Sequence, residues 1–171
     1  MASNLVQRVG FAAVAIPLAL GLVWLGGLPL ALLVAIVGVL GTRELFSFAE
    51  RQGIRPLALP GLATAAALPR LVWGAGQSPA LGDALAGDWP YIGALWLIAL
   101  LTWVLATRGP DAKPLTAAAV TLLGPAYCAG LPAFLLGIRH GEHGMQSWAG
   151  AVLVFLPLVV TWVCDSAAMF V

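Results

Sequence analysis

The sequence predicts an all-α fold, a polytopic membrane helix bundle with about six transmembrane helices. Of its 171 residues, 61% are hydrophobic and only 9% are charged, and the mean hydropathy is +1.00. A soluble domain is nearer to about 45–50% apolar and about 25% charged. The apolar residues also form runs close to the ~20 residues that a helix needs to cross a bilayer. These runs are continuous rather than alternating, which argues against a membrane β-barrel.

Six apolar segments follow one another along the chain, and we treat residues 1–171 as a single membrane domain. Their expected bounds are Val9–Leu25, Leu30–Phe48, Leu57–Trp73, Tyr91–Thr107, Leu115–Ile138 and Trp148–Val171. The stretch Gly74–Pro90 is rich in Gly, Ala and Asp, so we expect an exposed loop or a shallow interfacial segment there. Pro60 and Pro69 leave open whether the third segment spans fully.

The distribution of Lys and Arg predicts which ends of the helices face the cytoplasm. If the N-terminus is cytoplasmic, the inner flanks hold Arg8, Arg43, Arg51, Arg55, Arg108 and Lys113, whereas the outer flanks hold only Arg70 and Arg139. This six-to-two excess follows the positive-inside rule. Six crossings then return the end of the sixth segment to the cytoplasmic side. A net charge of +1 gives no sign of a nucleic-acid partner.

Asp165 is the first candidate functional residue, because it lies in the apolar run TWVCDSAAMFV. A carboxylate at the centre of a membrane helix costs roughly 2.5–3.5 kcal/mol on insertion scales, so such residues usually have a function. Thr161 lies one turn earlier on the same helical face. A carboxylate at the cytoplasmic end of a helix kinked by Pro157 suits a divalent metal such as Mg²⁺. The alternative is an Asp that meets water at the interface.

Two other charged groups allow both a functional and a structural interpretation. Arg43 and Glu44 could bind a lipid phosphate or pair within the bundle, or they could be a charged helix end that reaches for the interface. His140, Glu142 and His143 resemble a metal cluster. Zinc sites need three or four ligands, however, and this stretch is expected on the outer side. We therefore favour a solvated loop.

Tyr127 lies in a stretch where the fifth segment should bend. Gly124, Pro125, Gly130 and Pro132 all fall within ten residues of one another. Irregular backbone at membrane depth is tolerated where it is buried in protein or lines a cavity. The bend could therefore border a substrate cavity or serve helix packing alone.

Four stretches in order resemble the phosphatidate cytidylyltransferases, also called CDP-diacylglycerol synthases. WVCDSAAMFV is similar to that family's W-x-x-D-[ST]-x-A-[YM] motif, although Met169 stands where Tyr is usual. QRVGFAAVAIPLAL resembles its Arg-led first helix, and RELFSFAERQGIRP the end of its second helix. TLLGPAYCAGLPAFLLGIR resembles its Gly-x-x-Tyr helix that ends in Arg.

The resemblance implies an enzyme that transfers CMP from CTP to phosphatidate, giving CDP-diacylglycerol and diphosphate, with Mg²⁺ as cofactor. Asp165 would be a catalytic residue and a metal ligand. Its partners would be CTP, phosphatidate and membrane lipid, with a homodimer as one assembly to consider. The implied location is the bacterial inner (plasma) membrane, with the N-terminus and the Asp165 end cytoplasmic.

The family's later signature of lysines, paired acids and Pro-Gly-His-Gly-Gly is not in the sequence. We therefore expect the chain to be the N-terminal portion of a longer enzyme, inactive by itself, with the second metal ligand and the CTP-binding residues beyond Val171. Two alternative functions are also compatible with the sequence. One is a small transporter or channel subunit that uses Asp165 as a proton or ion relay, and the other is an assembly subunit in which Asp165 pairs with a partner's arginine.

Overall fold

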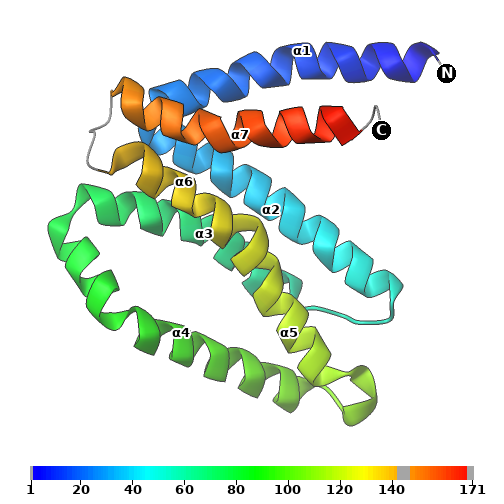
Figure 1. Cartoon of the computed structure of the whole chain (residues 1–171). Helices are drawn as coiled ribbons and strands as arrows, with labels where there is room; N and C mark the ends of the chain where they lie inside the picture. Colours follow the sequence, from blue (N-terminus) through cyan, green and yellow to red (C-terminus); the bar gives the residue numbers. More distant parts are fainter. Residues whose placement is uncertain (1, 142–146, 169–171) are drawn as a thin grey trace.

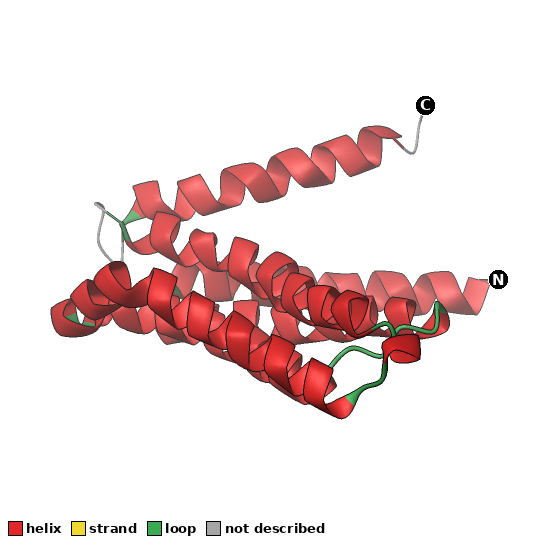
Figure 2. Ribbon diagram, turned by 90° about the horizontal axis from the view of Figure 1, so that it is seen from below, coloured by secondary structure: helices red, strands yellow, loops and turns green. Residues whose placement is uncertain are grey.

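A computed structural model describes the backbone of residues 2–141 and 147–168. The side chains of these residues are described except at 2–9, 11, 12, 162, 165 and 166. The described part is helical throughout, with short loops and no strand (Figure 2). The predicted all-α fold is therefore confirmed.

Seven α-helices, one 3₁₀ turn and one π-helical segment make up the described part of the chain. They are α1 (Ala2–Leu25), α2 (Gly27–Arg51), α3 (Ala58–Gln77), α4 (Pro79–Thr107), η1 (Pro110–Ala112), α5 (Pro114–Pro125), η2 (Ala126–Gly130), α6 (Leu131–His140) and α7 (Trp148–Ala168). Because α5, η2 and α6 follow without a gap, they form one bent rod (Figure 1). The described part of the chain thus contains six rods, one for each predicted apolar segment.

Three of the described rods are long and apolar enough to cross a membrane, namely Gly27–Arg51, Pro79–Thr107 and Pro110–His140. Ala13–Leu25 and Trp148–Thr161 are shorter apolar helical stretches, and α3 is not among either group. A 20-residue helix measures about 30 Å, close to the hydrocarbon thickness of a bilayer. These findings establish a membrane protein.

The bundle has its centre where α2 packs against α3 and the bent rod, while α4 covers one side and α1 and α7 the other. Successive connections alternate between two ends (Figure 1). The α1–α2 turn and the α6–α7 connection share one end, and the α2–α3 and α4–α5 connections share the other. This alternation is the one that six antiparallel crossings require.

Glycines allow the central helices to approach closely. Phe46 of α2 is 3% exposed. A Cβ on Gly61 of α3 would come within 2.5 Å of the Phe46 ring, and a Cβ on Gly124 of α5 within 2.8 Å. The ring therefore fills the space that the two glycines leave. Small residues at helix interfaces commonly have this function in membrane bundles.

The start of the fourth helix differs from the prediction. Gly74–Pro90 was expected to be a loop or an interfacial segment, yet α3 continues to Gln77 and α4 begins at Pro79. Ser78 is the N-cap, and its side chain accepts a hydrogen bond from the Leu81 N–H at 3.4 Å. Proline favours the first turn of a helix, where its missing N–H has no consequence. The expected exposure holds, since most of the first half of α4 is exposed.

Candidate functional site

The bend in the fifth segment is a π-helical turn. Pro125 ends α5, and the Leu131 N–H donates to the Ala126 carbonyl five residues back. Pro132 has no N–H to offer to the carbonyl of Cys128, four residues earlier. The bend predicted from the glycines and prolines is therefore confirmed. Turns of this kind are frequent at functional sites.

A shallow groove runs along this bend, between α2 and the bent rod. It is lined by Val37, Gly41, Tyr127, Cys128, Leu131 and Pro132. Gly41 makes the close approach possible, because a Cβ there would lie 3.3 Å from the Cys128 Sγ. Tyr127 is 62% exposed, so its ring stands at the edge of the groove rather than in the core. The groove is mostly apolar, with one phenol at its rim.

Two polar groups on α2 lie close to this groove. Glu44 is exposed and follows Gly41 by about one helical turn, so the two residues share a face. Thr42 is fully buried, and its hydroxyl interacts with the Cys128 thiol without a regular hydrogen bond among the described residues. Arg43 is also exposed. The exposure of Arg43 and Glu44 agrees with a charged helix end and leaves both available to a ligand.

Asp165 lies in the C-terminal part of α7, but its side chain is outside the described residues. One turn earlier, the Thr161 hydroxyl donates to the Pro157 carbonyl at 2.8 Å and so is committed to its own helix. No group of three or more His, Cys, Asp or Glu residues gathers among the side chains that the structure describes. The described side chains therefore do not show a metal-binding cluster of these residue types.

The end of the bundle that holds the α1–α2 turn and the α6–α7 connection contains a polar clamp, which the sequence did not predict. Arg139 was expected at a polar, outward flank, but it is helical and only 1% exposed. Its Nε donates to the Val23 carbonyl at 3.1 Å, and its Nη2 donates to the Trp24 carbonyl at 2.8 Å. These carbonyls belong to the last turn of α1, where no intrahelical donor is available. The only sequence signal was an arginine that ends a long apolar helix.

His140 completes this clamp. Its Nδ1 donates to the Leu136 carbonyl at 2.9 Å, and its Nε2 accepts the Gly27 N–H at 2.7 Å. This pattern corresponds to a neutral imidazole with the proton on Nδ1. His140 was expected in a solvated loop but is half-buried in α6. Glu142 and His143, the other members of the suggested metal cluster, lie outside the described residues.

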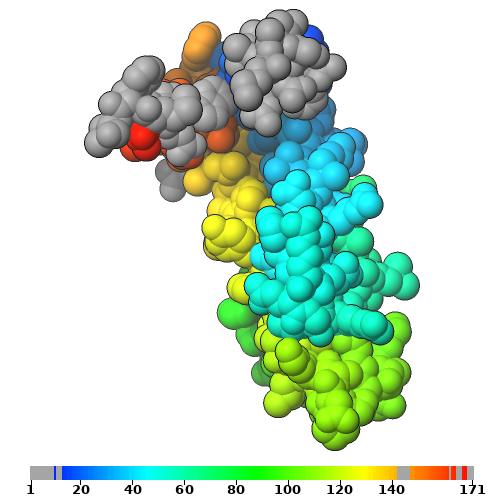
Figure 3. All heavy atoms as spheres, turned by 90° about the vertical axis from the view of Figure 1, so that its right-hand side faces the viewer, coloured from blue at the N-terminus to red at the C-terminus, as the bar shows by residue number. Residues whose placement is uncertain are grey.

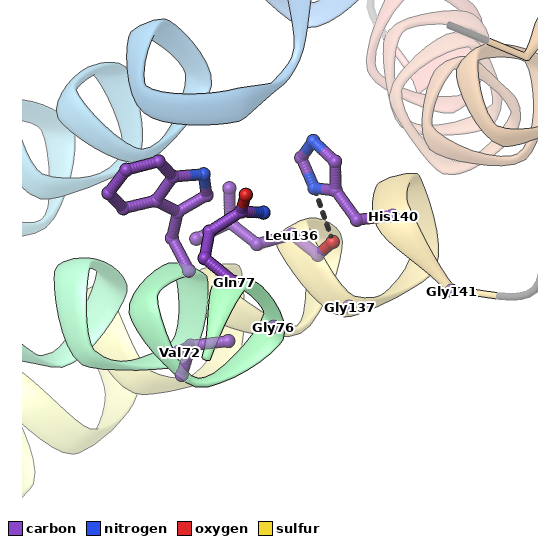
Figure 4. Close-up of a pocket in the computed structure, with 8 residues that line it drawn as sticks. Val72, Gly76, Gln77, Leu136, Gly137, His140 and Gly141 are labelled. Carbon is purple, nitrogen blue, oxygen red and sulfur yellow. Dashed lines mark hydrogen bonds between the residues drawn. The ribbon is translucent and has the colours of Figure 1, made fainter. Parts of the chain in front are cut away.

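A small pocket of about 170 Å³ lies beside the clamp, between the ends of α3 and α6 (Figure 4). Val72, Gly76, Gln77, Leu136, Gly137 and His140 are among its lining residues. Both ring nitrogens of His140 are already engaged, as described above. The remaining lining is largely apolar, so this pocket offers little to a metal or a charged ligand.

The fold and these sites define a polytopic helical membrane protein with an apolar groove at a π-helical bend and an acidic residue in its last helix. The cytidylyltransferase family model matches residues 6–171, which is nearly the whole chain. The chain therefore belongs to the cytidylyltransferase family. No curated protein and no solved structure matches it.

Proposed function

We propose that the protein transfers CMP from CTP to phosphatidate, producing CDP-diacylglycerol and diphosphate. The observation that carries this proposal is a cytidylyltransferase match that covers a bundle of apolar helices. An enzyme built almost wholly within the membrane can take its acceptor directly from the bilayer. Phosphatidate supplies both the acyl chains that keep it there and a phosphate that can act as the nucleophile. The four stretches that resemble phosphatidate cytidylyltransferases support the same acceptor.

In the proposed reaction, an oxygen of the phosphatidate phosphate attacks the α-phosphorus of CTP. A new P–O–P bond forms, and the bond between the α-phosphorus and the bridging oxygen of the diphosphate breaks. Diphosphate leaves with the electron pair. In such phosphoryl-type transfers the protein mainly positions the partners and neutralises their charge.

We assign Asp165 as a catalytic residue and one ligand of Mg²⁺. Carboxylate oxygen is a preferred ligand of this hard cation, which commonly binds through one or two carboxylates together with substrate phosphates. The cation would offset the charge of the phosphates when bound. Metal binding would explain why a carboxylate, which is otherwise unfavourable in an apolar helix, lies at this position. The six-to-two charge count supports a cytoplasmic position for this end of α7, where CTP is available.

We assign the groove beside Tyr127 to the acyl chains of the acceptor. Its apolar lining from α2, η2 and α6 suits hydrocarbon, and Tyr127 at its rim provides a hydroxyl that could meet a polar headgroup. Glu44 and Arg43 lie farther along α2, toward the end of the bundle that we infer to be cytoplasmic. A lipid in the groove would therefore direct its headgroup toward that end.

The decisive experiment measures transfer from radiolabelled CTP to a panel of lipid acceptors by the full-length protein in mixed micelles. We expect a CTP-dependent product with phosphatidate and no product with phosphatidylcholine. Asp165→Asn should abolish the reaction while preserving membrane insertion, and Cys164→Ser, a change at an exposed neighbour, should leave it intact. Transfer to a different acceptor alone would refute phosphatidate as substrate. An active Asp165→Asn variant would remove Asp165 from the site.

A further inference from the structure

Two arginines from distant parts of the chain line one hollow at the end of the bundle that holds the α2–α3 and α4–α5 connections. The hollow has a volume of about 430 Å³ and is lined by Gly53, Arg55, Arg108 and Ala112. Figure 3 looks onto this end and shows the residues after α2, in cyan to teal, beside those of the α4–α5 connection, in lime. The hollow therefore joins two connections that are separated by about two helices in the sequence.

The backbone on the α2 side of the hollow is fixed. Gly53 has φ +75°, a left-handed conformation that glycine adopts readily. The Ile54 N–H donates to the Ala49 carbonyl at 3.0 Å, which closes the end of α2. Pro56 is buried, and the Leu57 N–H donates to the Thr121 hydroxyl of α5 at 2.8 Å. Arg55 is thus held between two anchored points.

The main chain of Arg55 helps to position the side chain of Arg108. A guanidinium N–H of Arg108, on Nη1, donates to the main-chain carbonyl of Arg55. Arg108 is half-buried, whereas Arg55 is exposed. A guanidinium carries five N–H groups in a fixed fork, so Arg108 keeps donors beyond this bond. Lys113, which follows the lining residue Ala112 in the chain, has φ 50°, an uncommon conformation for a residue with a side chain.

The charges in this hollow are not balanced by its own lining. None of its lining residues is acidic, and Asp111 beside Ala112 is exposed on η1. Two guanidinium groups that share one cavity repel each other unless an anion lies between them. Forked arginine donors match the geometry of phosphate oxygens and bind them in a bidentate manner.

The surroundings favour a lipid as the source of that phosphate. Leu59 and Leu115, in the first turns of α3 and α5, are 78% and 66% exposed. Apolar helix surface thus begins directly beside the hollow, as it does where headgroups give way to acyl chains. We propose that Arg55 and Arg108 form a binding site for the phosphate of an anionic membrane lipid. The site is separate from the transfer reaction proposed above.

Native mass spectrometry of the full-length protein, with phosphatidylglycerol added to the detergent, tests this site. We expect one phosphatidylglycerol to remain bound in preference to phosphatidylcholine. Arg55→Gln should reduce that preference about tenfold, which corresponds to about 1.4 kcal/mol. This variant should still fold, because the carbonyl that accepts from Arg108 is main chain. Arg108→Lys keeps the charge but loses the fork and should weaken binding by a smaller factor.

Arg70→Gln is the matched control, since it removes one exposed arginine that does not line the hollow. It should retain the preference of the unmodified protein. Equal binding by Arg55→Gln and Arg70→Gln would overturn the proposal. If inorganic phosphate at millimolar concentration displaces the lipid completely, the site recognises free phosphate, and the lipid assignment is wrong. Because neither readout uses CTP, failure here leaves the proposed transfer reaction unaffected.

Discussion

Replacement of Arg139 by methionine should destabilise the bundle far more than an ordinary surface change. Methionine keeps much of the length and apolar stem of arginine but has no donor. The Val23 and Trp24 carbonyls at the end of α1 would each lose a hydrogen bond, of 3.1 Å and 2.8 Å respectively. Because Arg139 is 1% exposed, water has little access to replace it. The connection between α1 and α6 would depend on apolar packing alone.

The size of the effect follows from these two bonds. A hydrogen bond to a charged group contributes about 1.5–3 kcal/mol, so the pair is worth about 3–6 kcal/mol. The substitution also removes a buried cation, whose Nη1 has no partner among the described residues. The desolvation cost of that cation is then no longer incurred, which offsets part of the lost hydrogen-bond energy. We expect a net loss of about 2–4 kcal/mol, within the range known for buried polar networks. For a chain of this size, that loss lowers the melting temperature by about 5–12 °C.

Thermal unfolding of the purified protein in detergent, followed by circular dichroism, measures this loss. Arg70→Met is the matched control, because Arg70 is exposed on α3 and its replacement should shift the melting temperature by only about 1–2 °C. Arg139→Lys should give an intermediate value, since one ammonium cannot reproduce the forked contact with two carbonyls. Equal melting temperatures for Arg139→Met and Arg70→Met would refute the capping function that we assign to Arg139.

Two further predictions concern close packing and a buried hydroxyl. Gly38→Ala should destabilise the protein by about 1–3 kcal/mol, because the new Cβ would lie 2.6 Å from a side chain of η2. Gly93→Ala, in open space on α4, should instead be neutral or stabilising by about 0.5–1 kcal/mol; the reverse order of melting temperatures would contradict this packing. Thr121→Val should cost about 1–3 kcal/mol, because it leaves the half-buried Leu57 N–H without its acceptor. The exposed Thr116→Val is its control, and equal stability of the two variants would show that the bond is unimportant.

The architecture was predictable because composition and run length determine it. A chain this apolar has to bury its polar backbone in helices when it lies in a bilayer, so six apolar runs became six rods. The bend after Gly124 was predictable for a similar local reason, since Pro125 and Pro132 each remove a backbone donor. The π-helical form of the bend was not predictable. At this bend η2 packs against Gly38 and Gly41 of α2, which lie far away in the sequence.

The sequence did not predict the start of α4 or the burial of Arg139. The local signal for the first was weak, and the second depends on tertiary contacts. The early start of α4 was missed because Gly and Ala in Gly74–Pro90 are compatible with either loop or helix, although Ser78 and Pro79 were present as a start signal. The burial of Arg139 was missed because its partners on α1 are more than a hundred residues away. Asp165 stays a prediction, since its side chain lies outside the described residues.

The two ends of the bundle use their cationic and imidazole groups in opposite ways, and this difference bears on where chemistry takes place. At the end with the α6–α7 connection, Arg139 and His140 direct their donors and acceptors to helix termini of the same chain. At the other end, Arg55 and Arg108 line an open hollow. Phosphate-bearing ligands need cations that are still free to bind them. Since α7 starts at the clamped end, it carries Asp165 away from the clamp and toward the end with open charges. If Asp165 acts as proposed, the transfer reaction takes place toward this end of the bundle, while the hollow of Arg55 and Arg108 is a separate lipid-phosphate site.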